Sequence, residues 1–345
     1  MRPIKPNRLF PGDTVAIVSP SWGGPSTYPW VYKKGIQNLQ NLGLKIKEYP
    51  TARADTDYIY NNPQVRAKDI NDAFADKEVK AIITTIGGDD SIRILPFLDK
   101  EMALNNPKIL MGYSDTTTVT TFYNYFGLVT FSGPSVMAGF SQMESLGDQF
   151  QQHIKDFLFG NTTNYTYRSF PFYSEGYPDF EKKENSGKIK NKKQPNGWHW
   201  LQGRGVVHGN LFGGCIEVLE FLKGTSFWFP SNFFKEKIFF LETSEEKPSI
   251  SQVKYMLRNY GIQGVLDKIS AILFGRARDY SDDEKKLLDD TILKIIKQEF
   301  GNKNVTIVTN MDFGHTDPQF ILPLGIKAEL DNNKQTFKLN ESIFR

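Results

Sequence analysis

Short apolar runs alternate with longer amphipathic stretches in the N-terminal part of the chain, up to about residue 130. The strand-like runs are 15–18, 44–49, 79–85 and 108–111. Apolar side chains recur at helical spacing in three stretches, 32–42, 64–74 and 116–126. Alternating strands and helices are the pattern of βαβ units, so this part of the chain predicts a largely parallel sheet.

The sequence changes in character between about Asn161 and Asn196, where Tyr, Ser, Pro, Gly, Asn and Lys dominate without sustained periodicity. Such a composition is typical of a connection between domains. Beyond it, a helix is predicted to begin at Gly213-Gly214, and the tail 320–344 predicts short antiparallel strands. The other predicted strands are 206–207, 237–241, 271–274 and 305–308, and the other helices are 249–260 and 281–300.

These patterns predict an α/β protein with two domains. Residues 1–165 form an N-terminal α/β domain with a mostly parallel sheet, 166–200 a linker, and 201–345 a C-terminal mixed α/β domain. The length of 345 residues supports this division, because one hydrophobic core seldom organises so long a chain. With 27 Phe and 15 Tyr, the chain can fill its cores and leave aromatic side chains for a pocket.

Charge argues against a nucleic acid polymer as the partner. The 42 basic and 39 acidic residues are spread along the chain and give a formal net charge of only +3, whereas nucleic-acid binding needs a concentrated basic surface. One lysine-rich run, 182–193, is interpreted as a solvated part of the linker.

The single cysteine, Cys215, excludes an intramolecular disulfide and a thiolate metal cage, which suits a reducing compartment. The segment 1–6 has no apolar stretch of the kind found in signal peptides, and no later run approaches the ~18 apolar residues of a membrane span. We therefore expect a cytoplasmic protein without a membrane partner.

Ser114 lies where a predicted buried strand meets a predicted helix, in the sequence Gly112-Tyr113-Ser114-Asp115-Thr116. A sharp strand-to-helix turn lifts a serine hydroxyl out of a sheet, and amides at the helix start can hold an oxyanion. Thr116 replaces the final glycine of the usual nucleophile elbow. Taken alone, Ser114-Asp115 also fits an ordinary helix N-cap.

The turn Gly87-Gly88-Asp89-Asp90-Ser91 repeats this strand-then-turn arrangement one unit earlier. Glycines let backbone approach a ligand closely, so the Gly88 amide is a candidate second oxyanion donor. A plain glycine turn capped by Asp or Ser explains the same residues. A metal site at the two aspartates is less favoured, since neither His nor Cys lies nearby.

A nucleophilic serine needs a base and an orienting acid. Of the four histidines, His315 follows a buried strand on a tight polar loop, from which a base can reach across a cleft. The other three are His153 in an amphipathic helix, and His199 and His208 beside glycines. Glu242 ends an apolar strand, which is costly unless its charge is paired; a glutamate emerging into solvent is the alternative.

Other residues could serve the site or merely pack. Cys215 follows two glycines at a predicted helix start, where the helix dipole lowers a thiol pKa, but a small buried core residue fits as well. Four tryptophans flank glycine- or proline-rich loops and could line a cleft: Trp22, Trp30, Trp198 and Trp200. Four arginines are candidate partners for a substrate carboxylate: Arg93, Arg204, Arg276 and Arg278.

Taken together, these motifs resemble the LD-carboxypeptidase family of serine peptidases, and within it the branch of the microcin C self-immunity peptidase. The matching segments run nearly end to end and are 11–20, 87–88, 112–115, 209–214, 240–242 and 313–316. The resemblance implies Ser114 as nucleophile, Glu242 as orienting acid and His315 as general base. It also implies an oxyanion hole near Gly88 and Asp115, an active site in a cleft between the domains, and a homodimer.

The resemblance leaves two substrate classes open. Some members release terminal D-alanine from murein tetrapeptides, whereas immunity-type members cleave the amide between a peptidyl aspartate and a modified nucleotide. The Gly-Gly-Asp-Asp turn, with Asp89, and the Trp198 and Trp200 region favour the second, since an indole can stack on a nucleobase. We therefore predict an amide hydrolase that acts on a small or short-peptide substrate and needs no metal or cofactor; a non-catalytic binding module on the same scaffold is the alternative.

Overall fold

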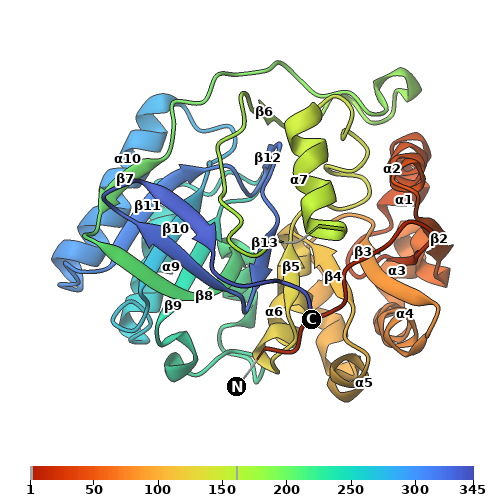
Figure 1. Cartoon of the computed structure of the whole chain (residues 1–345), viewed down its shortest axis with the longest axis horizontal. Coiled ribbons are helices and arrows are strands. Elements are labelled where there is room, and N and C mark those ends of the chain that lie inside the picture. The colour runs from red at the N-terminus through yellow and green to blue at the C-terminus, as the bar shows by residue number, and fades with distance from the viewer. Residues whose placement is uncertain (1–2, 161) are drawn as a thin grey trace.

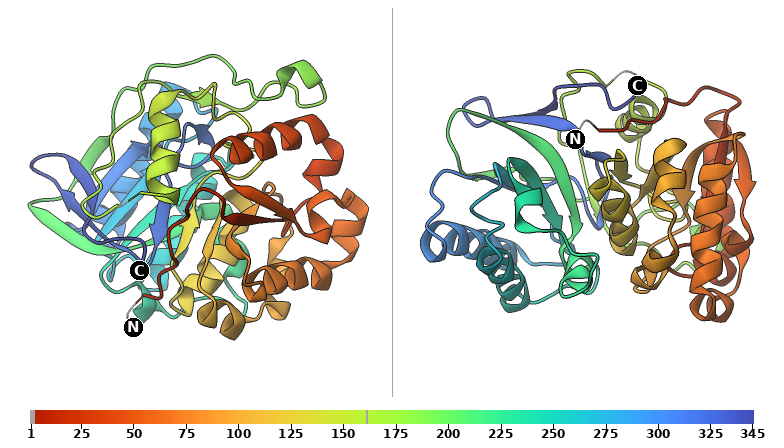
Figure 2. Two further views of the ribbon diagram at one scale, coloured as in Figure 1. Left: turned by 45° about the vertical axis from the view of Figure 1, so that its right-hand side comes forward. Right: turned by 90° about the horizontal axis from the view of Figure 1, so that it is seen from below.

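The computed structural model describes residues 3–160 and 162–345. Met1 and Arg2 of the N-terminal segment, and Asn161, at which the predicted connection begins, lie outside the described residues. Two large sheets with helices packed on them lie side by side (Figures 1 and 2). The first half of the chain forms most of one sheet, and the second half forms the other. The predicted fold class, a parallel-sheet α/β half followed by a mixed α/β half, is confirmed.

The first sheet has the strand order β13-β5-β4-β3-β1-β2, and all neighbours except β13 run parallel. Its strands are β1 (Thr14–Val18), β2 (Lys45–Glu48), β3 (Val79–Thr84), β4 (Ile109–Gly112), β5 (Thr130–Ser132) and β13 (Leu322–Leu324). The central strands β1, β3 and β4 are buried almost throughout, as continuous apolar runs in a parallel sheet require.

Helices lie around this sheet (Figure 1). The apolar side chains of its central strands are buried. The helices are α1 (Gly24–Thr27), α2 (Pro29–Asn41), α3 (Thr56–Asn61), α4 (Pro63–Ala75), α5 (Lys100–Asn105), α6 (Thr117–Tyr125) and α7 (Asp148–Leu158), with 3-10 turns η1 (Pro50–Arg53), η2 (Ser91–Phe97) and η3 (Ser114–Thr116). Local sequence starts several of them: α2 and α4 begin with proline, and Asp55 caps α3 by accepting from the Tyr58 amide at 2.7 Å.

The second sheet has the order β15-β14-β8-β9-β10-β11-β7, with a parallel centre and antiparallel edges. Its strands are β7 (His199–Gln202), β8 (Val206–Cys215), β9 (Lys237–Glu242), β10 (Ala271–Gly275), β11 (Thr306–Met311), β14 (Lys327–Asp331) and β15 (Thr336–Leu339). Its helices are α8 (Ile216–Leu222), α9 (Ile250–Ile262) and α10 (Asp282–Leu293), with the 3-10 turn η5 (Ser231–Phe234).

The predicted helix start at Gly213-Gly214 is wrong, because both glycines lie inside β8 and the helix begins at Ile216. Their φ values are +151° and +153°. A Cβ on Gly213 would lie 1.7 Å from the Phe240 carbonyl oxygen, and one on Gly214 would lie 2.4 Å from Thr117 Cγ2. The pair therefore serves the close approach of β8 to β9 and α6, which the sequence does not reveal.

Serine capping boxes start α9 and α10, at Ser249 with Gln252 and at Ser281 with Glu284. The predicted helix 281–300 is divided: α10 ends at Leu293, and a π-helical stretch, η6 (Lys294–Glu299), continues it.

The segment between the halves and the C-terminal tail tie the molecule together. After α7 the chain passes through β6 (Ser174–Glu175) and the short turn η4 (Lys183–Asn185), running across the molecule before it enters β7 (Figure 1). β6 pairs with β12 (Thr316–Asp317), and β13 from the tail pairs with β5 in the first sheet. The domain limits at 165 and 201 stay a prediction.

Candidate active site

Ser114 lies at a sharp turn directly after β4, with a backbone φ of +59°. Such a value is uncommon outside glycine and is typical of a serine lifted out of a sheet by a nucleophile elbow. Glycines make room for the turn. A Cβ on Gly87 would lie 2.9 Å from Ser114 Oγ, and a Cβ on Gly112 would lie 2.4 Å from Thr84 Oγ1.

Three predicted side chains meet at this turn. His315 Nε2 is 3.0 Å from Ser114 Oγ, and His315 Nδ1 is 2.7 Å from Glu242 Oε2. Ser114 comes from the first half of the chain, whereas Glu242 and His315 come from the second. All three residues are at most 9% exposed. This is the geometry of a serine, a base and an acid that orients the base.

Neighbouring glycines leave the space that the Glu242 side chain and the His315 loop occupy. Glu242 ends β9, and a Cβ on Gly275 would lie 2.8 Å from its own Cβ. Gly314, with φ +95°, passes so close that a Cβ there would lie 2.7 Å from Glu242 Oε2. Burial raises the pKa of Glu242, and the imidazole of His315 opposes that effect by favouring the carboxylate. The pairing with His315 is what makes a buried charge tolerable here.

The loop that carries His315 is fixed by a buried ion pair. Arg276 Nη2 donates to Asp312 Oδ1 at 2.9 Å, and both side chains are about 1% exposed. Trp198 Nε1 donates to the other carboxylate oxygen of Asp312 at 2.7 Å. A carboxylate with donors on both oxygens holds its loop in one position. Arg276 and Trp198 therefore fix Asp312, and with it the start of the loop that carries His315.

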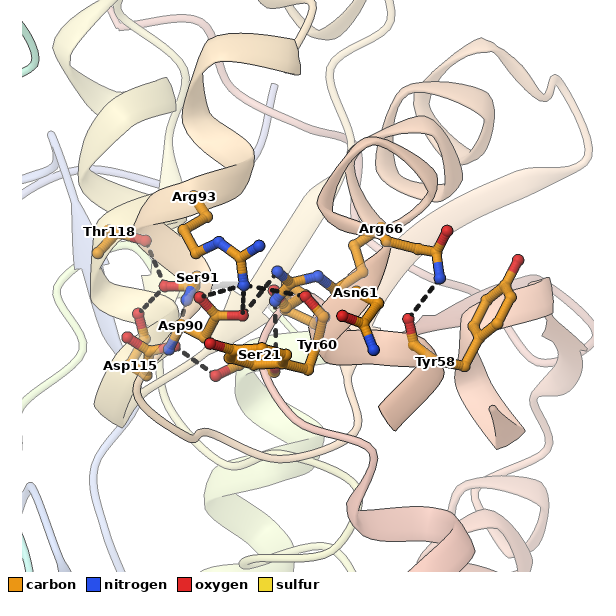
Figure 3. A network of polar contacts seen from close by, with 12 residues as sticks. Ser21, Tyr58, Tyr60, Asn61, Arg66, Asp90, Ser91, Arg93, Asp115 and Thr118 are labelled. Atoms are coloured by element: carbon orange, nitrogen blue, oxygen red, sulfur yellow. Dashed lines mark hydrogen bonds and ion pairs between the residues drawn. The ribbon is translucent and has the colours of Figure 1, made fainter. Parts of the chain in front are cut away.

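Asp115, the residue after Ser114, binds the glycine turn 87–91 at Asp90 and Ser91 (Figure 3). Its carboxylate accepts from the amides of Asp90 and Ser91, at 3.1 and 2.8 Å, and from the Ser21 hydroxyl. The Ser91 hydroxyl in turn donates to the Asp115 carbonyl oxygen at 2.7 Å. Burial raises the pKa of Asp115, while these donors favour its ionised form.

A second layer of charges supports the same turn. Arg66 is fully buried and donates to the carbonyl oxygens of Pro20 and Ser21, at 2.9 and 3.0 Å, and to Asp90 Oδ2 at 2.8 Å. Arg93 reaches the same carboxylate oxygen at 3.0 Å from the exposed side (Figure 3). The network joins the loop after β1 to the loop after β3, so both lie in fixed positions beside Ser114.

A cavity of about 470 Å³ opens onto Ser114 and His315. Its walls include Gly87 and Gly88 of the glycine turn, and three charged side chains, Glu245, Arg278 and Asp179. Five aromatic side chains line it further: Trp22, Tyr28, Tyr113, Tyr177 and Phe180. Tyr177 and Phe180 are stacked with ring centroids 5.0 Å apart, and Phe180 meets Tyr28 edge-on at 5.6 Å. The cavity thus combines the Ser114–His315 pair with an aromatic wall.

Two family models match the chain over most of its length. The LD-carboxypeptidase N-terminal domain matches residues 15–133, and the LD-carboxypeptidase C-terminal domain matches residues 208–330. The chain belongs to the LD-carboxypeptidase family.

Curated relatives of this LD-carboxypeptidase family member match almost end to end. Microcin C7 self-immunity protein MccF of Escherichia coli is 28% identical over 344 residues, which cover 98% of this chain and 96% of that protein. A probable murein peptide carboxypeptidase of Bacillus subtilis is 25% identical and covers 98% of this chain and 95% of its own length.

Solved structures of the family superpose closely on this chain. MccF in complex with glutamyl sulfamoyl guanosine has a TM-score of 0.87 and 26% identity, covering 99% of this chain and 100% of that one. An MccF-like protein from Streptococcus pneumoniae in complex with AMP has a TM-score of 0.82 and 28% identity, covering 95% and 98%.

The structure does not bring every candidate residue of this LD-carboxypeptidase family member to the cavity. Trp198 and Trp200 line a separate cavity of about 540 Å³, because Trp198 is held by Asp312 and Trp200 lies on β7 at the edge of the second sheet. Asp89 is exposed and does not line the catalytic cavity, although Gly88 beside it does. Of the four tryptophans considered, Trp22 is the one that lines it.

The remaining candidates are placed elsewhere or are engaged. Among the four arginines, Arg278 lines the cavity and pairs with Asp279. Arg276 and Arg93 are paired with Asp312 and Asp90 and do not line it. His153 accepts the Ile321 amide, and His199 pairs with Asp289. Cys215 is buried, which raises its thiol pKa well above the usual value and makes it a packed core residue.

Sequence reasoning missed several residues at the cavity. Tyr177 and Phe180 lie in the connecting segment, where their neighbours Gly176 and Pro178 favour an interpretation as linker. Tyr113 packs its ring 5.1 Å from that of His315. Glu245 Oε2 lies 2.9 Å from His315 Nε2. Its sequence, Thr-Ser-Glu-Glu-Lys, is that of an ordinary exposed turn, so only the fold could identify it.

Within the described ranges 3–160 and 162–345, there is no group of three or more His, Cys, Asp or Glu side chains that could hold a metal ion. In the same ranges, no helix has the length and apolar character that a membrane span requires.

Proposed function

We propose that this protein is a serine peptidase that cleaves an amide through an acyl-enzyme, with Ser114 as nucleophile, His315 as general base and Glu242 as orienting acid. The observation that carries the proposal is the continuous hydrogen-bonded line from Ser114 Oγ through His315 to Glu242, open to a cavity. Membership of the LD-carboxypeptidase family supports it independently.

In the proposed reaction, His315 Nε2 takes the proton of Ser114 Oγ as the oxygen attacks the amide carbonyl carbon. The protonated imidazole then gives this proton to the leaving nitrogen, and the C–N bond breaks to leave an ester on Ser114. Water, deprotonated by the same imidazole, hydrolyses the ester and restores the serine. Glu242 keeps the Nδ1–H oriented and stabilises the imidazolium in both steps.

The oxyanion is proposed to bind the backbone amides of Gly88 and Asp115. Two observations support these donors: the Asp115 amide lies at the start of the turn that leads into α6, and the glycine turn is packed against Ser114. The hydrogen bonds to the Asp115 carboxylate fix the two donor-bearing segments relative to each other. Donors held in place before the reaction stabilise developing charge most effectively.

The proposed substrate class is a small aminoacyl or peptidyl conjugate of a nucleotide. The aromatic wall formed by Trp22, Tyr28, Tyr177 and Phe180 offers faces and edges for a nucleobase to pack on. Two solved relatives of this chain hold ligands that contain a nucleoside: MccF is in complex with glutamyl sulfamoyl guanosine, and the MccF-like protein from Streptococcus pneumoniae is in complex with AMP. Cleavage of a murein tetrapeptide is the competing activity, in line with the Bacillus subtilis relative described as a probable murein peptide carboxypeptidase.

The decisive assay compares purified protein on aspartyl sulfamoyl adenosine and on a murein tetrapeptide side by side. We expect hydrolysis of the nucleotide conjugate to be the faster reaction and to disappear in Ser114→Ala, which removes only the hydroxyl. A Ser114→Ala protein that retains substantial hydrolysis would remove Ser114 from its role. Faster release of D-alanine from the tetrapeptide would instead assign the murein activity, and reversible binding without turnover would favour the non-catalytic module.

We further propose that the protein acts as a cytoplasmic homodimer. The family resemblance supports the dimer, and the single buried cysteine suits a reducing compartment. Light scattering on the eluting protein would test the dimer, since the chain mass is 39.4 kDa and a dimer doubles it.

A further inference from the structure

Glu245 lies where the catalytic imidazole meets the cavity. Its Oε2 is 2.9 Å from His315 Nε2, the same nitrogen that lies 3.0 Å from Ser114 Oγ. A carboxylate only accepts hydrogen bonds, so a bond to Glu245 requires a proton on Nε2. With Nδ1 also donating to Glu242, the imidazole is then doubly protonated. In that state it cannot take the proton of Ser114.

The charges around His315 agree with this geometry. Burial favours the neutral imidazole, but the carboxylates of Glu242 and Glu245 outweigh it and raise the pKa of His315 from 6.5 to about 10. The His315 partner likewise lowers the pKa of Glu245 to about 2. The ionisable groups that face His315 and Glu245 from the neighbouring elements are Glu242, Tyr113, Asp317 and Arg278.

The Glu245 side chain is placed to turn away from His315. It is 49% exposed, whereas the Glu242 side chain is 4% exposed. The preceding residue is fixed, because the Ser244 amide and hydroxyl both donate to Glu217 Oε1, at 2.9 and 2.7 Å. Within residues 3–160 and 162–345, no side chain other than His315 forms a hydrogen bond or ion pair with the Glu245 carboxylate. A rotation of this one side chain therefore uncovers Nε2.

Building on the proposed function, we propose that Glu245 is a specificity-determining residue that selects substrates with a free ammonium group on the carbon next to the scissile carbonyl. The scissile carbonyl must lie against Ser114 Oγ, and Glu245 Oε2 lies within 3.0 Å of the same His315 nitrogen as that oxygen, so an ammonium on the adjacent carbon is within reach of Glu245. An ammonium there pairs with the carboxylate and draws it from His315. The Nε2 proton then passes to water, and the base becomes available.

An acylated nitrogen at the same position carries no charge and leaves Glu245 on His315. Aminoacyl conjugates should therefore be cleaved in preference to peptidyl conjugates of the same nucleotide. An α-amino group has a pKa near 8, so it is largely protonated at neutral pH and can make the required ion pair.

The test compares aspartyl sulfamoyl adenosine with its Nα-acetyl derivative at pH 7, using wild type, Glu245→Gln and Glu246→Gln. Glu246 is the matched control, because it is an exposed neighbour of the same type. We expect Glu245→Gln to lower the ratio of kcat/KM for the free amine to that for the acetylated substrate by on the order of tenfold or more, by slowing the first and accelerating the second. Glu246→Gln should leave the ratio unchanged.

The pH profile gives a second readout. The base form of His315 appears only as pH rises through its pKa, so removing one of the two carboxylates should move the acid limb of kcat/KM for the acetylated substrate to lower pH. An unchanged substrate ratio in Glu245→Gln, or an equal change in Glu246→Gln, would overturn the proposal while leaving the hydrolase intact. If wild type cleaves neither substrate, the proposed function fails instead. In that case NMR titration of the His315 imidazole tests the role of Glu245. The proposal requires the pKa of His315 to be lower in Glu245→Gln than in wild type.

Discussion

At the scale of single residues, the site depends on backbone that only certain side chains allow. Ser114 keeps a positive φ because glycines at 87 and 112 leave space around its turn, and Gly314 lets the His315 loop pass directly beside Glu242. Strain of this kind persists only where the surroundings enforce it, here through Asp115 and its donors. The nucleophile is therefore held by its neighbours as much as by its own strand.

Replacing Glu242 by Gln tests the orienting role at this scale. The substitution keeps size and shape but removes the charge that fixes the imidazole and stabilises its protonated form, so kcat should fall on the order of a thousandfold or more. Steady-state kinetics on the nucleotide conjugate would measure the loss, with circular dichroism as a check on folding. A fall of less than tenfold in a folded variant would show that Glu242 does not act on His315.

Ser114, Glu242 and His315 could be proposed as catalytic from sequence because each ends a recognisable strand or follows one, and because their motifs resemble a known family. Glu245 could not be proposed, since its exposed turn has no apolar pattern and its importance depends on the distance to His315. The glycine-flanked loop and the family resemblance both predict Trp198 and Trp200 at the substrate cavity, whereas they line another one. Their positions depend on Asp312 and on the pairing of β7, which no local pattern encodes.

At the scale of elements, the strands and helices follow the apolar pattern closely, while the glycine pair at 213–214 shows the limit of that approach. Two adjacent glycines before an apolar run fit a helix start, yet they lie in β8 because β9 and α6 approach too closely for any side chain. Close approach between elements is a property of packing and is invisible in a local window.

Gly213→Ala and Gly264→Ala give a matched pair for this point. Both glycines have positive φ, but an added Cβ at 213 would meet the Phe240 carbonyl oxygen at 1.7 Å, whereas nothing lies within 4 Å at 264. Gly264→Ala should cost about 1 kcal/mol of unfolding free energy, from backbone strain alone, and Gly213→Ala at least about 2 kcal/mol more. Urea unfolding would measure both, and equal losses would contradict the packing explanation.

At the scale of the whole molecule, the two halves are joined by contacts that sequence order does not predict. β13 leaves the tail to pair with β5, and the Thr117 hydroxyl of α6 accepts from the Cys215 amide at 3.2 Å. His153 of α7 accepts the Ile321 amide at 2.8 Å, just before β13. Local patterns predict the fold class, because they are properties of single strands and helices. They do not predict where the tail packs, because its contacts join residues far apart in the sequence.

The His153 link should make stability depend on pH. Burial lowers the pKa of His153 from 6.5 to about 3, so the unfolded chain binds a proton there that the folded chain does not. Stability from this residue is present above about pH 6.5 and is lost as pH falls, by about 1.4 kcal/mol per pH unit. In His153→Gln, which keeps an acceptor but cannot be protonated, unfolding free energy should fall less between pH 7 and pH 5. Parallel declines in both proteins would contradict this assignment.

The central claim is that the substrate acylates Ser114 after His315, from the other half of the chain, has removed the proton of its hydroxyl. Mass spectrometry of the protein after reaction with a fluorophosphonate tests it directly, because the reagent captures an activated serine. Because the ion pair with Glu245 keeps His315 protonated in the free protein, the reaction is run on Glu245→Gln as well as on wild type. We predict a single adduct on the peptide that contains Ser114, formed faster in Glu245→Gln than in wild type and strongly reduced in His315→Ala. An adduct on another residue, or labelling of Ser114 that is unaffected by the loss of His315, would contradict the account.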